Sequence, residues 1–195
     1  MRNLKLWWKF EGRYYHKDLI QGIKNLWKWF PIVWKDRDYD HAFIYDILKF
    51  KLEKQANYIS KHDRHTRAKR DAETMLLCTR LIERCVDDFY GMEYMDYHVS
   101  NFNFVDITDD DNIPEKYRGS KKLEIEEISE NFDEYFKKYP IQYKRVLSGE
   151  INRYGNPISE KDKKNIAMEI AHENQNRCQN LLFKIMGDNI NKWWD

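Results

Sequence analysis

Apolar side chains recur every three or four residues along three long stretches of the chain, which is the spacing of helices that bury one face. The first stretch covers residues 40–60, and its apolar positions are Ile44, Ile47, Leu48, Leu52, Ala56 and Ile59. Residues 66–90 carry a wider apolar stripe, which indicates a central helix. The third stretch follows Ser159 and Asp162, which resemble an N-cap pair, and runs to Met186. We therefore expect three long helices.

The connections between these stretches suggest how the helices are arranged. The polar link at residues 61–65 is too short for anything except a turn, so the first two helices are expected to form an antiparallel hairpin. Residues 18–30 and 123–139 have the spacing of shorter helices, and Pro140 ends the second of them. Residues 91–120 differ, because Phe102 and Phe104 stand in alternation there, and they predict an irregular aromatic-rich insertion with room for one short strand.

The expected fold class is all-α, a helical bundle built on a long antiparallel hairpin plus a long C-terminal helix. At 195 residues the chain has about the size of one domain, so we expect a single helical domain over residues 1–195. Hydrophobic residues make up 42% of the chain and charged residues 34%, a balance that argues against disorder.

Net charge and cysteine spacing bear on partners and compartment. The net charge of +1 provides no global field for a polyanion, so we expect neither nucleic acid nor membrane as a partner. The basic, tryptophan-rich start leaves contact with a membrane surface as the minor alternative to core packing. Cys78 and Cys85 lie seven residues apart on one predicted helix, roughly 10 Å, and cannot form a disulfide. Reduced thiols and the lack of a signal-peptide pattern favour a cytoplasmic protein.

The densest polar cluster runs from Trp34 to His41, directly before the first long helix. It begins like a calcium loop, but the glycine and the glutamate that such a loop requires are missing. In the simplest interpretation Asp38 or Asp40 caps the helix and Arg37 pairs with neighbouring carboxylates. The alternative is a ligand or partner surface at the positive end of the helix, to which Tyr39 adds an aromatic ring.

A second polar cluster surrounds the predicted turn and includes Arg64, His65 and Arg67. A solvated basic edge is its simplest interpretation, and contact with an anion is the alternative. The first helix separates this turn from His41 by about 30 Å, so the two clusters are not expected to meet within one subunit. A homodimer could bring the turn of one chain to the helix start of the other.

Signatures of catalysis are weak. Glu169 and His172 have the Glu-x-x-His spacing of di-iron bundles, but those bundles need the pair twice and two further glutamates. The sequence contains no Gly-rich phosphate loop, no Gly-x-Ser-x-Gly elbow and no His-Glu-x-x-His motif. The cysteines lie within or beside apolar helix faces, where thiols are usually inert. We expect no catalytic residue, no metal and no cofactor, and a binding protein rather than an enzyme.

Trp34 to His41, the upstream Gly22-Ile23-Lys24-Asn25-Leu26 and the closing Lys192-Trp193-Trp194-Asp195 resemble small uncharacterised proteins encoded by tailed bacteriophages. The resemblance covers about half of the chain. In those proteins a tryptophan-led Asp-Arg-Asp motif precedes a helix rich in Lys, Leu and Glu, as residues 47–56 are here. It implies a phage gene expressed in the bacterial host cytoplasm and transfers no catalytic residue. A virion component is the common alternative for such a gene product.

These observations predict a non-enzymatic binding protein for an anionic ligand that contains a ring, because guanidinium groups bind phosphate and aromatic faces bind a base. In a phage setting we expect a nucleotide-like signalling molecule of host immunity, which a homo-oligomer sequesters as an anti-defence function. The candidate ligand-binding residues are Trp34, Arg37, Asp38, Tyr39, His41, Arg64, His65 and Arg67.

Two alternatives remain open. One is a structural or protein-interaction module, virion-associated or bound to a host factor, in which Trp193 and Trp194 would lie in an interface. The other, less favoured, is a metal-dependent hydrolase that uses Glu169 and His172.

Overall fold

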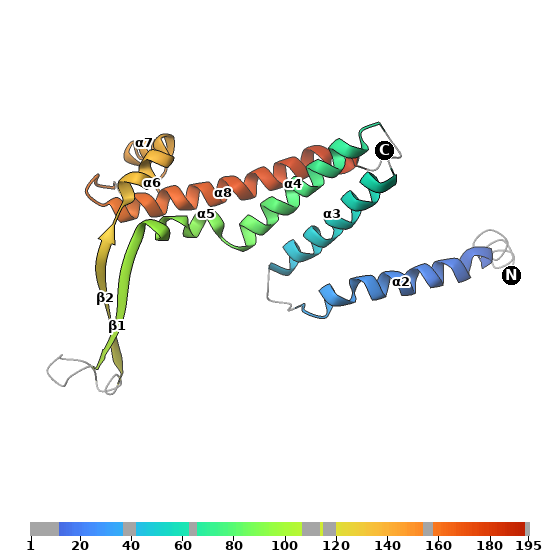
Figure 1. Ribbon diagram of the computed structural model, residues 1–195, viewed down its shortest axis with the longest axis horizontal. Helices are drawn as coiled ribbons and strands as arrows, with labels where there is room; N and C mark the ends of the chain where they lie inside the picture. Colours follow the sequence, from blue (N-terminus) through green and yellow to red (C-terminus); the bar gives the residue numbers. More distant parts are fainter. Residues whose placement is uncertain are drawn as a thin grey trace. The chain divides into compact units, whose positions relative to one another are not determined.

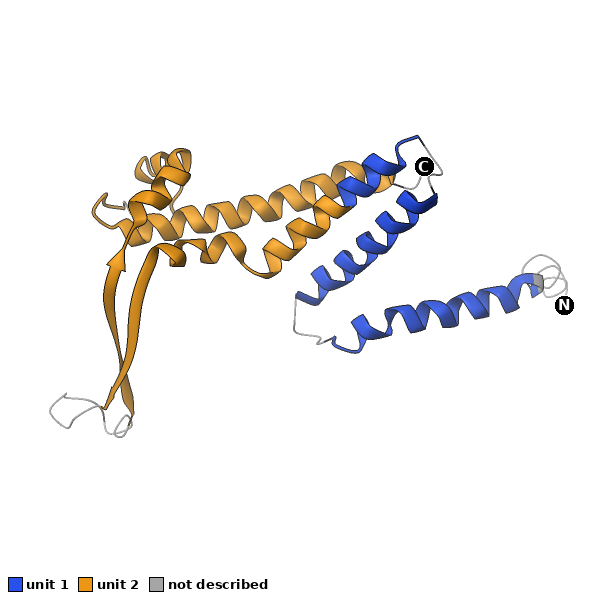
Figure 2. Ribbon diagram, in the orientation of Figure 1, with its two compact units in different colours: residues 1–75 blue, residues 76–195 orange. Residues whose placement is uncertain are grey.

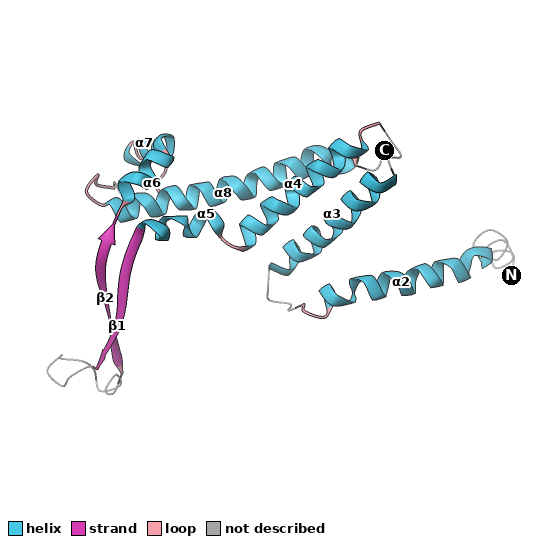
Figure 3. Ribbon diagram, in the orientation of Figure 1, coloured by secondary structure: helices cyan, strands magenta, loops and turns pink. Residues whose placement is uncertain are grey.

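The computed structural model describes residues 12–36, 42–62, 66–106, 114, 120–153 and 158–193 (Figure 1). The chain forms two compact units, residues 1–75 and residues 76–195 (Figure 2). Helices account for 73% of the described residues, and these residues also contain a two-stranded antiparallel sheet (Figure 3). The mostly helical prediction is confirmed, and the sheet corrects the all-α class. The single domain stays a prediction.

Unit 1 contains η1 (Gly12–Tyr14), α2 (Tyr15–Val33), α3 (Ala42–His62) and the first two turns of α4 (Ala68–Val86). α3 follows the periodicity of residues 40–60, and Leu52 and Ala56 of its apolar stripe are buried. α2 is longer than predicted and continues through Pro31, which lies near its end, where a missing N–H removes only one helical hydrogen bond. The Trp29 ring of α2 packs edge-on against Phe50 of α3, with ring centroids 4.8 Å apart.

Unit 2 continues from α4 through α5 (Phe89–Met92), η2 (Glu93–Tyr97), β1 (His98–Asp106), β2 (Lys121–Glu130), α6 (Phe132–Lys138), α7 (Pro140–Leu147), α8 (Lys163–Asn189) and η4 (Ile190–Lys192). α8 confirms the third long helix. The Asp162 side chain caps it by accepting a hydrogen bond of 3.4 Å from the backbone N–H of Asn165. Trp193 is only 2% exposed, so the first of the closing indoles is docked, whereas Trp194 lies outside the described residues.

The core of unit 2 lies where α6 and α7 pack on the N-terminal half of α8. Its buried members are Phe132, Tyr135, Phe136, Val146, Ile151, Ile166, Ala167 and Ile170. Four tyrosines, Tyr94, Tyr97, Tyr139 and Tyr143, pack against this cluster with Ile158. Aromatic rings therefore supply much of the buried apolar surface that holds the short helices together.

A buried carboxylate fastens η2 to α6. Glu93 is 8% exposed and accepts hydrogen bonds from the Lys138 ammonium group and, at 2.6 Å, from the Tyr139 hydroxyl. Burial and then the bond to Glu93 raise the pKa of Tyr139, so this hydroxyl keeps its proton and continues to donate. The charge of Glu93 is thus compensated inside the core.

β1 and β2 form a two-stranded ribbon, which we call the β-arm. Phe102 is paired with Ile125 and Phe104 with Leu123, and the register shifts by one residue between Val99 and Ser100. The prediction of a helix over residues 123–139 is wrong for its first half, because residues 121–130 form β2 and only α6 remains helical. Glutamates favour helices, but the alternation of Leu123 and Ile125 matches the period of the facing strand. In its described part, the predicted insertion over residues 91–120 contains the end of α5, η2 and β1, so it is more regular than expected and its strand pairs with β2 beyond it.

The second predicted helix, over residues 66–90, ends four residues early. α4 stops at Val86, and Asp88 adopts the left-handed conformation with φ of 48° before α5 begins. A side chain at Gly91 would place its Cβ 2.3 Å from the Asp88 carboxylate, so the Asp88 side chain would have to turn away to admit it. The sequence predicted one continuous helix because Phe89 and Tyr90 keep the apolar spacing of α4, although they belong to α5, which runs in a new direction.

We predict that Ile170→Ala lowers the free energy of unfolding by about 2–5 kcal/mol, because Ile170 is fully buried and its loss leaves a cavity. Urea denaturation followed by circular dichroism measures the change. Ile141→Ala is the matched control, because Ile141 is 68% exposed and its loss should change stability by about 0.5 kcal/mol or less. Equal effects of the two substitutions would contradict the position of the core.

Candidate functional site

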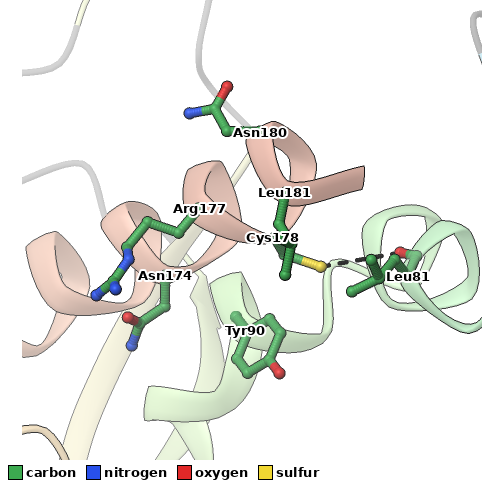
Figure 4. A pocket seen from close by; sticks show the side chains of 7 residues that line it. All are labelled: Leu81, Tyr90, Asn174, Arg177, Cys178, Asn180 and Leu181. Atoms are coloured by element: carbon green, nitrogen blue, oxygen red, sulfur yellow. Dashed lines mark hydrogen bonds between the residues drawn. The ribbon is translucent and has the colours of Figure 1, made fainter. Parts of the chain in front are cut away.

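A pocket of about 430 Å³ opens between α8 and the corner that joins α4 to α5 in unit 2. Figure 4 shows the side chains that line it: Leu81, Tyr90, Asn174, Arg177, Cys178, Asn180 and Leu181. Its volume lies within the range of small-molecule sites in proteins, roughly 300–1,000 Å³.

Helical spacing explains why α8 supplies most of the lining. Asn174, Arg177, Cys178 and Leu181 stand at intervals of three, one and three residues, which places them on one face of the helix. The pattern was visible in the sequence, but it resembled an ordinary buried stripe with two polar interruptions. Only the position of the α4–α5 corner shows that the stripe lines a pocket.

Gln175 connects the corner to α8. Its side-chain amide donates to the backbone carbonyls of Arg84 and Cys85, at 3.4 and 3.2 Å, and these carbonyls belong to the last turn of α4. Its carbonyl oxygen accepts a hydrogen bond of 3.2 Å from the backbone N–H of Tyr90. One side chain thus satisfies the end of α4 and the start of α5, and it places the Tyr90 ring at the pocket.

Asn174 and Arg177 both carry hydrogen-bond donors at the pocket that have no acceptor among the described residues. Asn174 is 8% exposed, and its carbonyl oxygen accepts from Gln142 at 3.3 Å, but its amide nitrogen is buried without a partner. Arg177 is exposed, and within the described part of the chain it makes no ion pair or hydrogen bond. An unpaired buried donor costs about 1–3 kcal/mol, which a ligand oxygen would offset.

Apart from the exposed Asn180 amide, the remaining wall is largely apolar. Leu81, Leu181 and the Tyr90 ring provide hydrocarbon surface, and the Cys178 sulfur lies 3.8 Å from the backbone oxygen of Leu81. The Cys85 thiol donates a hydrogen bond of 3.7 Å to the sulfur of Cys178, and both cysteines are reduced. Burial, followed by the hydrogen bond to Cys178, raises the pKa of Cys85 to about 12. Burial also raises the pKa of Cys78 to about 11.

This combination suits a particular chemistry. A guanidinium and an amide N–H bind the oxygens of a carboxylate or phosphate, and a tyrosine ring beside leucine side chains accommodates a flat apolar group. The Cys178 thiol is buried against Leu81 and Cys85, so it contributes packing to the wall. The pocket is therefore equipped to bind a small anion that carries a ring.

Most of the site residues predicted from the sequence lie outside the described residues, namely Arg37, Asp38, Tyr39, His41, Arg64 and His65. Trp34 is 73% exposed at the end of α2, and its ring is tilted against Phe30 with centroids 5.1 Å apart. Arg67 pairs at 3.7 Å with the buried Asp71 one turn further along the chain. Neither Trp34 nor Arg67 lines the pocket, and the sequence reasoning did not predict the residues that do.

The Glu-x-x-His pair is engaged by Arg153. Glu169 is buried and accepts a hydrogen bond of 3.2 Å from the Arg153 backbone N–H, while His172 lies 3.4 Å from the Arg153 guanidinium. The other ring nitrogen of His172 contacts Asn176 at 3.0 Å. Within the described ranges, no group of three or more histidine, cysteine, aspartate or glutamate side chains is arranged to hold a metal ion.

Comparisons with models of protein families, with curated proteins and with solved structures find no match to the chain. The phage resemblance therefore stays a prediction. Among the described helices none is long and apolar enough to cross a membrane.

We predict that Cys78 and Cys85 react with a thiol reagent at pH 8 at least about 100-fold more slowly in the folded chain than in the unfolded one, because the thiolate is the nucleophile. Their folded pKa values, about 11 and about 12, lie above the ordinary value of 9.0. The folding stability that these two protonated thiols contribute is therefore present below pH 9 and is lost as the pH rises toward 12.

Mass spectrometry of labelled peptides assigns the rate to each cysteine, and denaturation from pH 8 to pH 11 measures the stability. Fast labelling of Cys85 in the folded chain would contradict the packing of this α4 residue against Cys178 of α8.

Proposed function

We propose that the chain is a non-enzymatic binding protein and that its ligand is a small anion carrying a ring, bound in the pocket of unit 2. The proposal rests on one observation. Among the described residues, the buried side-chain N–H groups of Asn174 have no acceptor, and the neighbouring Arg177 guanidinium has no partner. The ring of Tyr90 and the two leucines supply the apolar side of the site.

A nucleotide is the class of ligand that combines these features, and we propose a nucleotide-like signalling molecule of host immunity, sequestered in the bacterial cytoplasm. The phage resemblance of the sequence supports this biological role, and the pocket chemistry supports the ligand class. The proposal retains the antiparallel hairpin of α3 and α4 as the scaffold of a helical bundle and a homo-oligomer as the binding form. It moves the expected ligand contacts from residues 34–41 and 64–67 to the pocket.

A second candidate function, a protein-interaction or structural module, is supported by a different observation. α2 is described along its whole length of 19 residues and buries none of them, although its sequence is strongly amphipathic. Large apolar faces left in water are typical of interaction surfaces.

We predict that Arg177→Gln weakens binding of the best nucleotide in a panel of mono-, di- and cyclic nucleotides by about 10-fold or more, since a charged hydrogen bond contributes about 1.5–3 kcal/mol. Asn174→Asp should weaken it further, because it keeps the acceptor for Gln142 and sets a negative charge against the anion. Isothermal titration calorimetry measures the affinities. Arg80→Gln is the control, because Arg80 is an exposed arginine of α4 outside the pocket.

Two outcomes would overturn this assignment. If no nucleotide of the panel binds, and native mass spectrometry of protein purified from infected, immune-activated bacteria releases none, the ligand class is wrong. If a nucleotide binds and Arg37→Gln or His41→Ala abolishes binding while Arg177→Gln does not, the site lies at the cluster that the sequence predicts.

A further inference from the structure

Two cysteine sulfurs from different helices of unit 2 are in contact. The Cys85 thiol of α4 donates a hydrogen bond of 3.7 Å to the sulfur of Cys178 on α8, although 93 positions separate the two residues in the chain. The Cys178 thiol in turn points toward α4 and donates to the backbone oxygen of Leu81 at 3.8 Å (Figure 4). The two sulfurs would have to move only about 1.7 Å closer to form an S–S bond of about 2.0 Å.

The backbone at Cys85 lies close to α8 because Gln175 binds it. The Gln175 side chain donates to the backbone carbonyl of Cys85 at 3.2 Å, and Gln175 and Cys178 are three residues apart on one face of α8. α4 ends at Val86, so Cys85 belongs to a terminal turn, which adjusts more easily than a helix interior. Rotation of the Cys85 side chain with a small shift of this turn therefore brings the sulfurs together.

The third cysteine is not placed to compete. Cys78 stands two turns before Cys85 on α4, roughly 10 Å away, and is fully buried. Cys85 is partly exposed, whereas Cys178 is 5% exposed. A reagent in solution therefore reaches Cys85 first, and Cys178 is in position as the second, resolving thiol.

We propose that Cys85 and Cys178 form a redox-modification site, which a low-molecular-weight disulfide such as oxidised glutathione converts into a disulfide that links α4 to α8. In the first step the Cys85 thiolate attacks one sulfur of the reagent, which forms a mixed disulfide and releases one thiol. In the second step the Cys178 thiolate attacks the Cys85 sulfur and expels the other thiol. The protein is oxidised by two electrons and loses two hydrogen atoms, and the reagent is reduced to two thiols. The proposal is independent of the ligand of the pocket.

Burial makes the modification slow to form and stable afterwards. The raised pKa of Cys85 keeps most of this thiol protonated at neutral pH, so we expect the exchange to take hours. The disulfide restricts the unfolded chain by closing a loop across 93 positions, and long loops give the larger stabilisation. The midpoint of thermal unfolding should therefore rise by about 10 °C.

Incubation of the full chain with oxidised glutathione at pH 8 for about one day, followed by acid quenching, tests the site. Peptide mass spectrometry without reduction should find Cys85 linked to Cys178 and Cys78 still a free thiol. The higher unfolding midpoint should return to its original value when a phosphine reduces the disulfide. Cys85→Ser should remove both the link and the rise in midpoint. Cys78→Ala is the matched control and should keep both, each variant being compared with its own reduced form.

Several outcomes would overturn the proposal. They are a chain that stays fully reduced, glutathione that persists as an adduct on Cys85, and a link that involves Cys78 or joins two chains. A linked chain that unfolds at the same temperature as the reduced chain, or at a lower one, would also overturn it, because the link would then not fit the native contact of α4 with α8.

Discussion

The hydrogen bonds of Gln175 are the constraint on which unit 2 depends at its pocket end. A helix that stops leaves its last carbonyls without partners, and a helix that starts leaves its first N–H groups without acceptors. α4 stops and α5 starts within three residues, and the amide of Gln175 serves both ends from the side of α8. The same contacts bring Tyr90 beside Asn174 and Arg177, so the pocket results from the hydrogen bonds that complete the α4–α5 corner.

Where the base of the β-arm meets α6, a different interaction has a similar role. There the carboxylate of Glu93 is buried among tyrosines and accepts from Lys138 and Tyr139, which ties η2, and with it the base of the β-arm, to α6. Gln175 lies in the middle of α8, and the buried positions of the helix run from Ile166 to Met186 on both sides of it, which explains why this helix is the most regular signal in the sequence.

The sequence predicted what depends on local periodicity. α3 and α8 were located within a few residues, and Asp162 was identified as part of the cap of α8. The prediction erred where two periods compete: Ile125, Ile128 and Phe132 fit a helix, but the partner strand and the shift next to Val99 place Ile125 and Ile128 in β2. The pocket could not be predicted for another reason. Asn174 and Arg177 line a pocket only because the α4–α5 corner, about 90 positions earlier in the chain, lies beside them, and no local sequence pattern encodes that contact.

The close approach of Gly91 to Asp88 has an evolutionary consequence. A side chain at position 91 would meet the carboxylate at position 88, which would have to turn away, whereas position 88 itself has a backbone conformation that glycine, asparagine and aspartate tolerate best. Position 88 is therefore the more restricted of the two sites: a replacement at 91 requires only a side-chain rotation, and a replacement of Asp88 by a residue other than these three strains the backbone itself.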